Sequence, residues 1–188
     1  MSIGYASSDA NSFIGSGGTN IDLSPSGFQV ALHGGYDYQV PNSNLVFGAE
    51  VMIPLLQLDK SRADPVLAGV SYGAKGNWAV LTSGKVGYAI GNWLPYVGAG
   101  VGFINARGTF VFPGVVTVED NHTHTGVLLL AGLRYMVNPN WWVGVQYMHG
   151  QYSTETYATA PAFPTANRNV GFSTDAVVVQ GTYRFTRW

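Results

Sequence analysis

The sequence contains no cysteine, which excludes disulfide bonds and every metal site that is built on thiolates. Charged residues make up only 10% of the chain, whereas a typical soluble domain has about 25%. That is too few to cover the water-facing surface of a soluble domain of 188 residues. Long apolar runs are also absent, because none approaches the roughly 20 residues that a membrane-spanning helix needs. The composition therefore fits neither an ordinary soluble domain nor a helical membrane protein.

Basic charge is scarce as well. The net charge is −1 and the isoelectric point is about 6.4, so the sequence has no basic stripe of the kind that binds nucleic acid. The first five residues, Met1-Ser-Ile-Gly-Tyr, lack the basic segment and apolar segment of a secretory signal peptide. An exported protein needs such a peptide, so we expect a mature or recombinant form in which Met1 is an added start.

Hydrophobic residues, glycine and aromatics are abundant. Hydrophobic residues make up 46% of the chain, aromatics make up 13%, and there are 25 glycines, yet the mean hydropathy is only +0.11. A transmembrane β-barrel explains this combination, because only every second residue of its strands faces lipid.

Strict alternation supports the barrel. Side chains on a strand point to opposite faces in turn, and residues 177–185 and 27–40 both alternate in this way. In the last strand, one face carries Val177, Val179, Gly181, Tyr183 and Phe185, and the other carries Val178, Gln180, Thr182 and Arg184. We expect the aromatic face to contact lipid. A soluble barrel would instead place its apolar residues inside and its charges outside.

The same pattern predicts eight strands. Seven are expected at residues 2–9, 27–40, 45–54, 77–90, 94–107, 123–137 and 141–152, and the eighth follows residue 171. The first strand is short, so we expect that upstream residues are missing, and Leu55–Leu58 has no place in the pattern. Long connections at 11–26, 59–76, 108–122 and 153–171 alternate with short turns at 41–44, 91–92 and 138–140. The sequence thus predicts one domain over residues 1–188, an antiparallel up-and-down outer-membrane barrel with long loops outside and short turns in the periplasm.

Aromatic residues provide a check on this orientation, since they were not used to place the turns. Near the short turns lie Tyr36, Tyr38, Phe47, Tyr88, Trp93, Tyr135, Trp141, Tyr183, Phe185 and Trp188, and near the long loops lie Trp78, Phe110, Tyr152 and Phe172. These sets predict two aromatic girdles, one at each membrane interface.

Polar residues of the strands share the inner face with the glycines. The expected lumen layer contains His33, Asp37, Glu50, Lys85, Arg134, Gln146, Gln180 and Arg184. Most of them lie within roughly 20 Å of the short turns along their strands. An unpaired charge in a narrow lumen costs several kcal/mol, so we expect an ion-paired plug. A gated, ion-lined path is the alternative.

Six short motifs occur in order along the chain. They are Phe47-Gly-Ala-Glu50, Gly84–Tyr88, Leu94–Gly100, Ala131–Tyr135, Val145–Tyr147 and Gly181–Phe185. Together they resemble the small outer-membrane immunogenic protein family, which comprises porin-like surface antigens of Gram-negative bacteria. The resemblance implies a role in envelope integrity and in contact with a host or surface, and some members of the family are described as porins or haem binders. The chain departs from the family in its last three residues and in Arg134, where an acid is common.

Two histidine sets are candidate sites. His122 and His124 lie at a loop edge near Glu119 and Asp120, where they would bind a metal or haem only with a third ligand. His149 shares a face with Gln151, Ser153 and Glu155, in a placement that resembles outer-membrane lipid A deacylases. Those enzymes carry serine where this chain has Gln151.

We therefore predict a structural surface protein with no catalytic residue, metal or cofactor. Its expected partners are outer-membrane lipid, lipopolysaccharide and a surface or host ligand at the loops. A conduit or binder for small solutes or haem is the alternative, and a hydrolase of outer-leaflet lipids is a more remote one.

Overall fold

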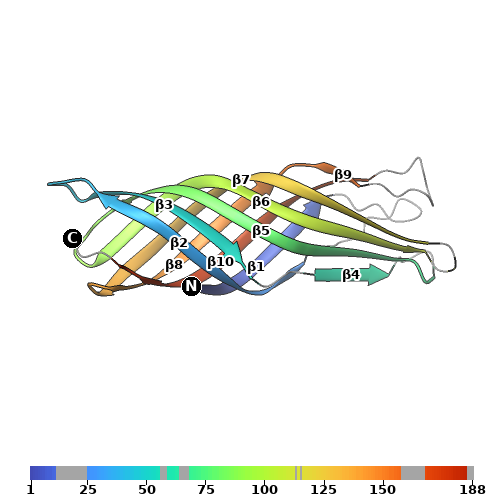
Figure 1. Cartoon of the computed structure of the whole chain (residues 1–188), viewed down its shortest axis with the longest axis horizontal. Coiled ribbons are helices and arrows are strands. Elements are labelled where there is room, and N and C mark those ends of the chain that lie inside the picture. Colours follow the sequence, from blue (N-terminus) through green and yellow to red (C-terminus); the bar gives the residue numbers. More distant parts are fainter. Residues whose placement is uncertain are drawn as a thin grey trace.

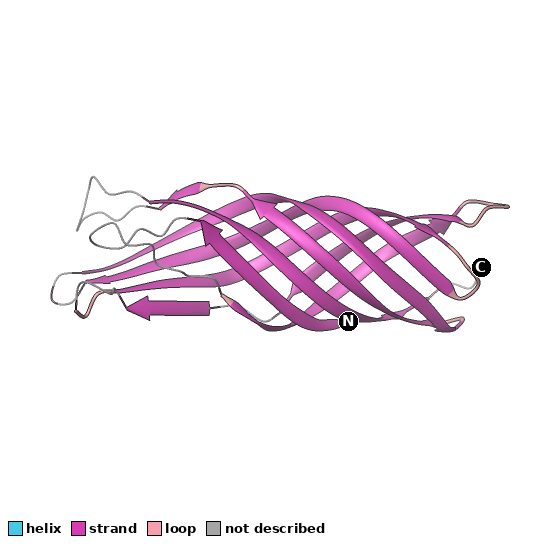
Figure 2. Cartoon of the chain, turned by 180° about the vertical axis from the view of Figure 1, so that it is seen from behind, coloured by secondary structure: helices cyan, strands magenta, loops and turns pink. Residues whose placement is uncertain are grey.

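The computed structural model describes residues 1–11, 25–55, 59–63, 68–112, 114, 116–157 and 168–185. All regular elements among these residues are β-strands, as Figure 2 shows from behind. The part of the chain that is described contains no helix long and apolar enough to cross a membrane.

Eight of the described strands form a closed antiparallel ring (Figure 1). In ring order they are β1 (Ser2–Asn11), β2 (Ser26–Gln39), β3 (Leu45–Pro54), β5 (Ser71–Tyr88), β6 (Trp93–Phe112), β7 (Val116–Asn138), β8 (Trp141–Tyr152) and β10 (Arg168–Tyr183). Pairing of β1 with β10 closes the ring, from Ser2 opposite Gln180 to Asn11 opposite Gly171. Two short strands lie beside the ring: β4 (Asp59–Ala63) pairs with β5, and β9 (Glu155–Tyr157) pairs with β10. The predicted eight-stranded up-and-down barrel is confirmed.

Three tight turns join strands at one end of the barrel, and the connections at the other end are longer (Figure 1). The β2–β3 turn contains Asn42 with φ of 58°, and the β5–β6 turn contains Gly91 with φ of 59°. Asparagine and glycine are the residues that tolerate this left-handed conformation in turns. The predicted turn positions thus agree with the structure.

Several strands extend further toward the long connections than the sequence pattern predicted. The expectation of a loop over residues 108–122 is wrong, because Gly108 pairs with Asp120 and the β6–β7 hairpin continues to Phe112 and Val116. The expected loop over 59–76 contains β4 and the start of β5, and that over 153–171 contains β9 and the start of β10. These segments lie beyond the apolar band, where outward residues such as Thr117, Glu119 and Asn121 are polar, so no apolar outward face marks a strand.

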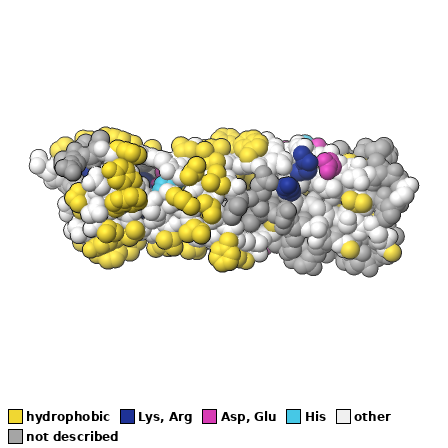
Figure 3. Space-filling model, turned by 60° about the horizontal axis from the view of Figure 1, so that its bottom comes forward, with side chains coloured by type: hydrophobic (Ala, Val, Ile, Leu, Met, Phe, Trp, Pro, Cys, Tyr) yellow, Lys and Arg dark blue, Asp and Glu magenta, His cyan; other side chains and the backbone are white. Residues whose placement is uncertain are grey.

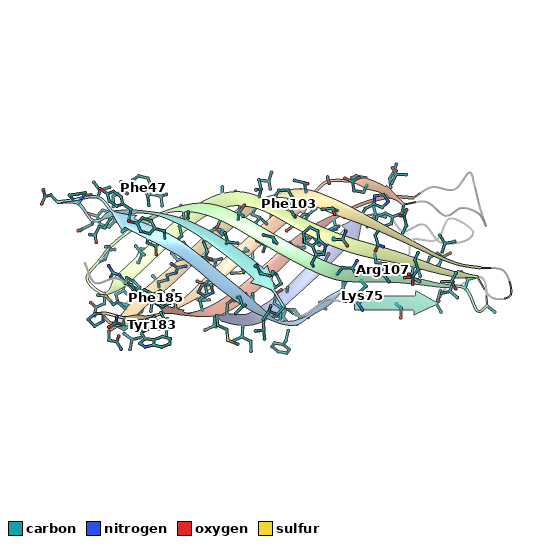
Figure 4. The ribbon with its side chains drawn as sticks, viewed as in Figure 1. Phe47, Lys75, Phe103, Arg107, Tyr183 and Phe185 are labelled. Atoms are coloured by element: carbon teal, nitrogen blue, oxygen red, sulfur yellow. The ribbon has the colours of Figure 1, made fainter. Side chains whose placement is uncertain are left out.

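An apolar band surrounds the barrel on the side of the short turns (Figure 3). On β7 it covers the outward residues from Val137 to Val127, and polar outward residues begin at Thr125. Figure 4 shows Phe47, Tyr183 and Phe185 near the short-turn end, Phe103 farther along, and Lys75 and Arg107 beyond it. A band of this kind is where the barrel crosses the bilayer.

Burial distinguishes this arrangement from a soluble barrel. Phe28 is 75% exposed on the outer wall, whereas Glu50 is only 5% exposed inside. Because apolar residues face out and charges face in, the soluble-barrel alternative is excluded.

Candidate functional site

Four charged side chains meet in the lumen near the short turns. Lys85 Nζ lies 3.0 Å from Glu50 Oε2 and 3.2 Å from Asp37 Oδ1. Arg134 donates to Asp37 Oδ2 over 3.1 Å and also donates to Glu50. Lys85, Glu50 and Arg134 are all buried. Two positive and two negative groups therefore neutralise one another inside the barrel, and we call these four residues the ionic layer.

Neutral side chains extend the ionic layer across the lumen. Tyr96 donates its hydroxyl hydrogen to Gln146 Oε1 over 2.7 Å. Gln180 accepts from Arg134 over 3.4 Å and donates to Gln146 over 3.4 Å. The cationic groups of Lys85 and Arg134 lie 5.4 and 5.1 Å from the centre of the Tyr96 ring. Sequence reasoning missed Tyr96, although its parity with Gly98 on β6 would have placed it inside.

Glycines make room for the ionic layer. Gly48 lies between Asp37 and Lys85 on three adjacent strands, and a Cβ at Gly48 would be 2.2 Å from Asp37 Oδ1. Gly144 lies in the same way between Arg134 and Gln180, and a Cβ there would be 2.9 Å from Arg134 Cγ. In both places the polar side chains of the two flanking strands meet above a glycine, which has no side chain of its own. Each glycine thus leaves room for a contact between its two neighbours, an ion pair over Gly48 and a hydrogen bond over Gly144.

Six of the eight predicted lumen residues pair with one another in this network, namely Asp37, Glu50, Lys85, Arg134, Gln146 and Gln180. His33 is half-buried, and its Nε2 lies 2.8 Å from Thr182 Oγ1. Arg184 follows the end of β10, where its backbone N–H donates to Asn140 and its carbonyl accepts from the Asn140 side chain.

A second polar cluster lies above the apolar band, where β9 meets β7. The buried ring of His124 contacts the Ser153 carbonyl oxygen through Nδ1 at 2.9 Å and the Tyr157 hydroxyl through Nε2 at 2.8 Å. His122 Nε2 lies 3.0 Å from Asp120. Burial lowers the pKa of His124 and raises that of Tyr157. Both nitrogens of His124 are therefore occupied by protein groups.

The predicted acidic partners of these histidines are divided between two faces. Glu119 points the other way and accepts from Arg107 over 3.2 Å on the outer surface. Within the described residues, no three histidine or acidic side chains come together as a metal-ligand set.

His149 contacts a residue that sequence reasoning had not paired with it. Its Nδ1 lies 2.9 Å from Asp175 Oδ1 on the neighbouring strand β10, and Tyr147 also donates to that oxygen. Ser153 instead donates to Glu155 over 3.0 Å. The outward parity of residues 173–179 would have pointed to Asp175.

Most of the predicted girdle residues face outward. Those exposed on the wall or its edge are Tyr36, Tyr38, Phe47, Trp78, Tyr88, Trp93, Trp141, Tyr183 and Phe185. Tyr135 is half-buried against Trp93, with ring centres 4.7 Å apart. Trp188 lies outside the described residues.

The outer girdle was predicted incorrectly at two positions. Tyr152 and Phe172 point into the lumen, where their rings stack with centres 4.8 Å apart. Proximity to a loop was the only reason for placing them outside, and their parity on the strands puts them on the inner face. The Phe110 side chain is not among those that the structure describes.

Comparisons with known proteins agree with the fold. A family model described as an outer membrane protein beta-barrel domain matches residues 1–185. No curated protein matches the chain. One similar solved structure is that of Ail of Yersinia pestis, crystallised with the heparin analogue sucrose octasulfate. It is 18% identical to this chain, the match covers 98% of this chain and 95% of Ail, and the TM-score is 0.50. Neisserial surface protein A is 16% identical, with coverage of 97% and 95% and a TM-score of 0.47.

Proposed function

Since the chain belongs to the outer membrane protein beta-barrel domain family and lies in the outer membrane, we propose that it serves there as a structural surface protein. In this role the barrel anchors the chain, the ionic layer closes the lumen, and the segments beyond the apolar band contact the outside. Enzymatic activity is not part of the proposal.

The observation that carries this proposal is the ionic layer. An eight-stranded barrel has an interior just wide enough for side chains to fill. Here Arg134 from β7 reaches across to Glu50 on β3 and Asp37 on β2, and Tyr96 and Gln146 occupy space beside them. A conduit would need these pairs to separate, which leaves buried charges without partners at a cost of several kcal/mol each.

Two cations support lipopolysaccharide as a partner. Lys75 and Arg107 are cross-strand neighbours on the parts of β5 and β6 beyond the apolar band (Figure 4). Figure 3 shows basic side chains beyond the apolar surface, with an acidic side chain beside them. This position suits contact with the phosphate groups of the outer leaflet, since cationic side chains bind phosphate strongly.

The haem-binding alternative has less support. An imidazole needs a free ring nitrogen to bind iron, and both nitrogens of His124 are engaged with Ser153 and Tyr157. His122 contacts Asp120. We therefore propose no haem or metal at this cluster.

Conductance across a planar lipid bilayer tests the proposal. The reconstituted protein should show no steady open state over a range of voltages. A variant with Glu50→Ala and Arg134→Ala, which removes one anion and one cation together, should conduct more than the original chain. A stable open channel in the unaltered protein would overturn the proposed closed lumen.

A further inference from the structure

Two adjoining cavities lie inside the barrel beyond the ionic layer, and His124 and Tyr157 line the smaller of them. The larger has a volume of about 270 Å³ and the smaller about 130 Å³. Gly76, Ile104 and Thr174 line both of them, so the cavities are neighbours. The larger cavity contains none of the residues to which we assigned closure of the lumen or surface contact, whereas Lys75 and Arg107 line the smaller one.

The wall of the larger cavity is mostly hydrocarbon. Leu81, Leu128, Met148 and Ala176 contribute to it from four different strands. Its polar lining residues are neutral, and none of the described residues that line it carries a charge. Ligand pockets with this character favour apolar molecules. An ionic solute would lose its hydration there without meeting an opposite charge among these residues.

Among the described residues, the β-ladder along one edge of β5 stops beside this cavity. Pairing of β5 with β3 ends where Leu81 lies opposite Met52, and its pairing with β4 reaches only to Lys75 opposite Asp59. The two ladders therefore leave a break between Leu81 and Lys75 within the described strands, and Figure 1 shows β3 ending before β4 begins. A β-bulge between Gly76 and Trp78 also breaks the register with β6 at this point.

Two residues beside this break in the ladder line the cavity and are also exposed on the outer surface. Leu55 and Trp78 contribute to the cavity wall, and they are 51% and 49% exposed. Trp78 pairs with Asn105, next to Phe103 at the upper edge of the apolar band. Leu55 and Trp78 therefore lie on the side of the outer leaflet rather than the periplasm.

We propose that the larger cavity binds a single unbranched hydrocarbon chain, which enters sideways from the outer leaflet between Leu55 and Trp78. The apolar wall selects a hydrocarbon, since none of the described lining residues offers a charge to an ionic solute. Leu55 and Trp78 extend from the cavity to the outer surface and give the hydrocarbon a route from lipid. The ionic layer lies below and blocks further passage. This hydrocarbon is either an acyl chain of a membrane lipid or a free alkane. Both present the same chemistry to the cavity.

Photo-crosslinking distinguishes these sources and tests the proposal. The full chain is reconstituted in lipid vesicles with a long alkane that carries a diazirine group, or with a phospholipid that carries the diazirine in one acyl chain. After illumination, mass spectrometry locates the labels on β7, where Leu128 points inward between the outward residues Val127 and Leu129. Labelling of Leu128 or Met148 supports the proposal, and the probe that produces it identifies the source. Labels confined to Val127, Leu129 and other outward residues overturn it.

A matched pair of substitutions adds a second test. Ala79 lines the cavity on β5, whereas Ala131 is exposed on the outer wall of β7. Ala79→Trp should abolish the inward labels by filling the cavity, and Ala131→Trp should keep them. A heat-dependent shift in gel mobility verifies that each variant is folded. Inward labels that persist in folded Ala79→Trp overturn the proposal. If this variant does not fold, the comparison of labels on inward and outward residues of the original protein decides.

Discussion

Tyr96 packs its ring directly over Gly132, its cross-strand partner on β7. A Cβ at Gly132 would lie 2.4 Å from the Tyr96 ring, well inside van der Waals contact. The same ring carries the hydroxyl that donates to Gln146 and lies against Lys85 and Arg134. The absence of one side chain on β7 thus positions the aromatic wall of the ionic layer.

We therefore expect Gly132→Val to lower the free energy of unfolding by about 1–3 kcal/mol, the usual cost of overpacking a filled interior. Gly84→Val is the matched control, since Gly84 faces outward and a Cβ there meets nothing within 4 Å. Its effect should stay within about 0.5 kcal/mol. Urea unfolding of the reconstituted barrel measures both. Equal losses at the two positions would show that Tyr96 is not held by Gly132.

Removal of one charge from the ionic layer should be costly. Glu50→Gln keeps the shape of the side chain but leaves Lys85 and Arg134 with Asp37 as their remaining anion. We expect a loss of about 3–5 kcal/mol, because breaking a buried pair leaves an uncompensated charge. Glu119→Gln breaks the exposed pair with Arg107 and should cost only about 0–1 kcal/mol.

The same unfolding measurement compares the two glutamate variants. Similar values for Glu50→Gln and Glu119→Gln would mean that water enters the lumen and screens the ionic layer. Adding Lys85→Met to Glu50→Gln should recover part of the stability, since it removes the excess cation and leaves Arg134 paired with Asp37.

The alternation of apolar and polar residues predicted the ring and its two faces. The bilayer imposes this alternation, because one face of each strand contacts lipid and the other faces the lumen. Outward Phe28 and inward Glu50 follow from parity alone, and so do the short turns, where asparagine and glycine interrupt the pattern. The same argument fails beyond residue 107 on β6. There water lies outside the wall, so Thr109, Glu119 and Asn121 show no hydrophobic alternation although their strands pair.

Partners across the lumen were not predictable from the sequence. Parity placed Glu50 and Arg134 inside, but whether they meet depends on how far the strands are staggered when the ring closes. The contact between His149 and Asp175 likewise depends on the register of β8 with β10. Proximity to a loop misplaced Tyr152 and Phe172 because it ignores the direction of the side chain.

Acid should weaken the attachment of β9 to the barrel. In neutral His124, Nδ1–H donates to Ser153 and Nε2 accepts from Tyr157, and burial lowers the pKa of His124 below its ordinary value. The unfolded segment therefore binds more protons than the folded one as pH falls below about 6.5. Above that pH the contact contributes its full stability. This stability is lost as the pH falls from about 6.5 toward the lowered pKa of folded His124.

Hydrogen exchange of residues 155–157, corrected for its intrinsic pH dependence, measures this effect. Protection should fall from neutral to mildly acidic pH. Among the charged neighbours, Glu155 opposes the shift in pKa of His124 and His122 adds to it. His124→Gln should remove most of the pH dependence and His122→Gln should keep it. An unchanged pH dependence in His124→Gln would assign the effect to another group.

The outward pair of His149 and Asp175 should not hydrolyse lipid. A histidine–serine–acid hydrolase needs the serine hydroxyl within hydrogen-bond reach of the imidazole. Here Ser153 donates to Glu155 and accepts from the Thr125 backbone, whereas His149 contacts Asp175. Mass spectrometry of lipopolysaccharide incubated with the reconstituted protein should therefore show intact acyl chains, as should the same experiment with His149→Ala. Loss of an acyl chain with the original protein but not with His149→Ala would identify a lipid esterase, with a nucleophile other than Ser153 or a rearranged rim.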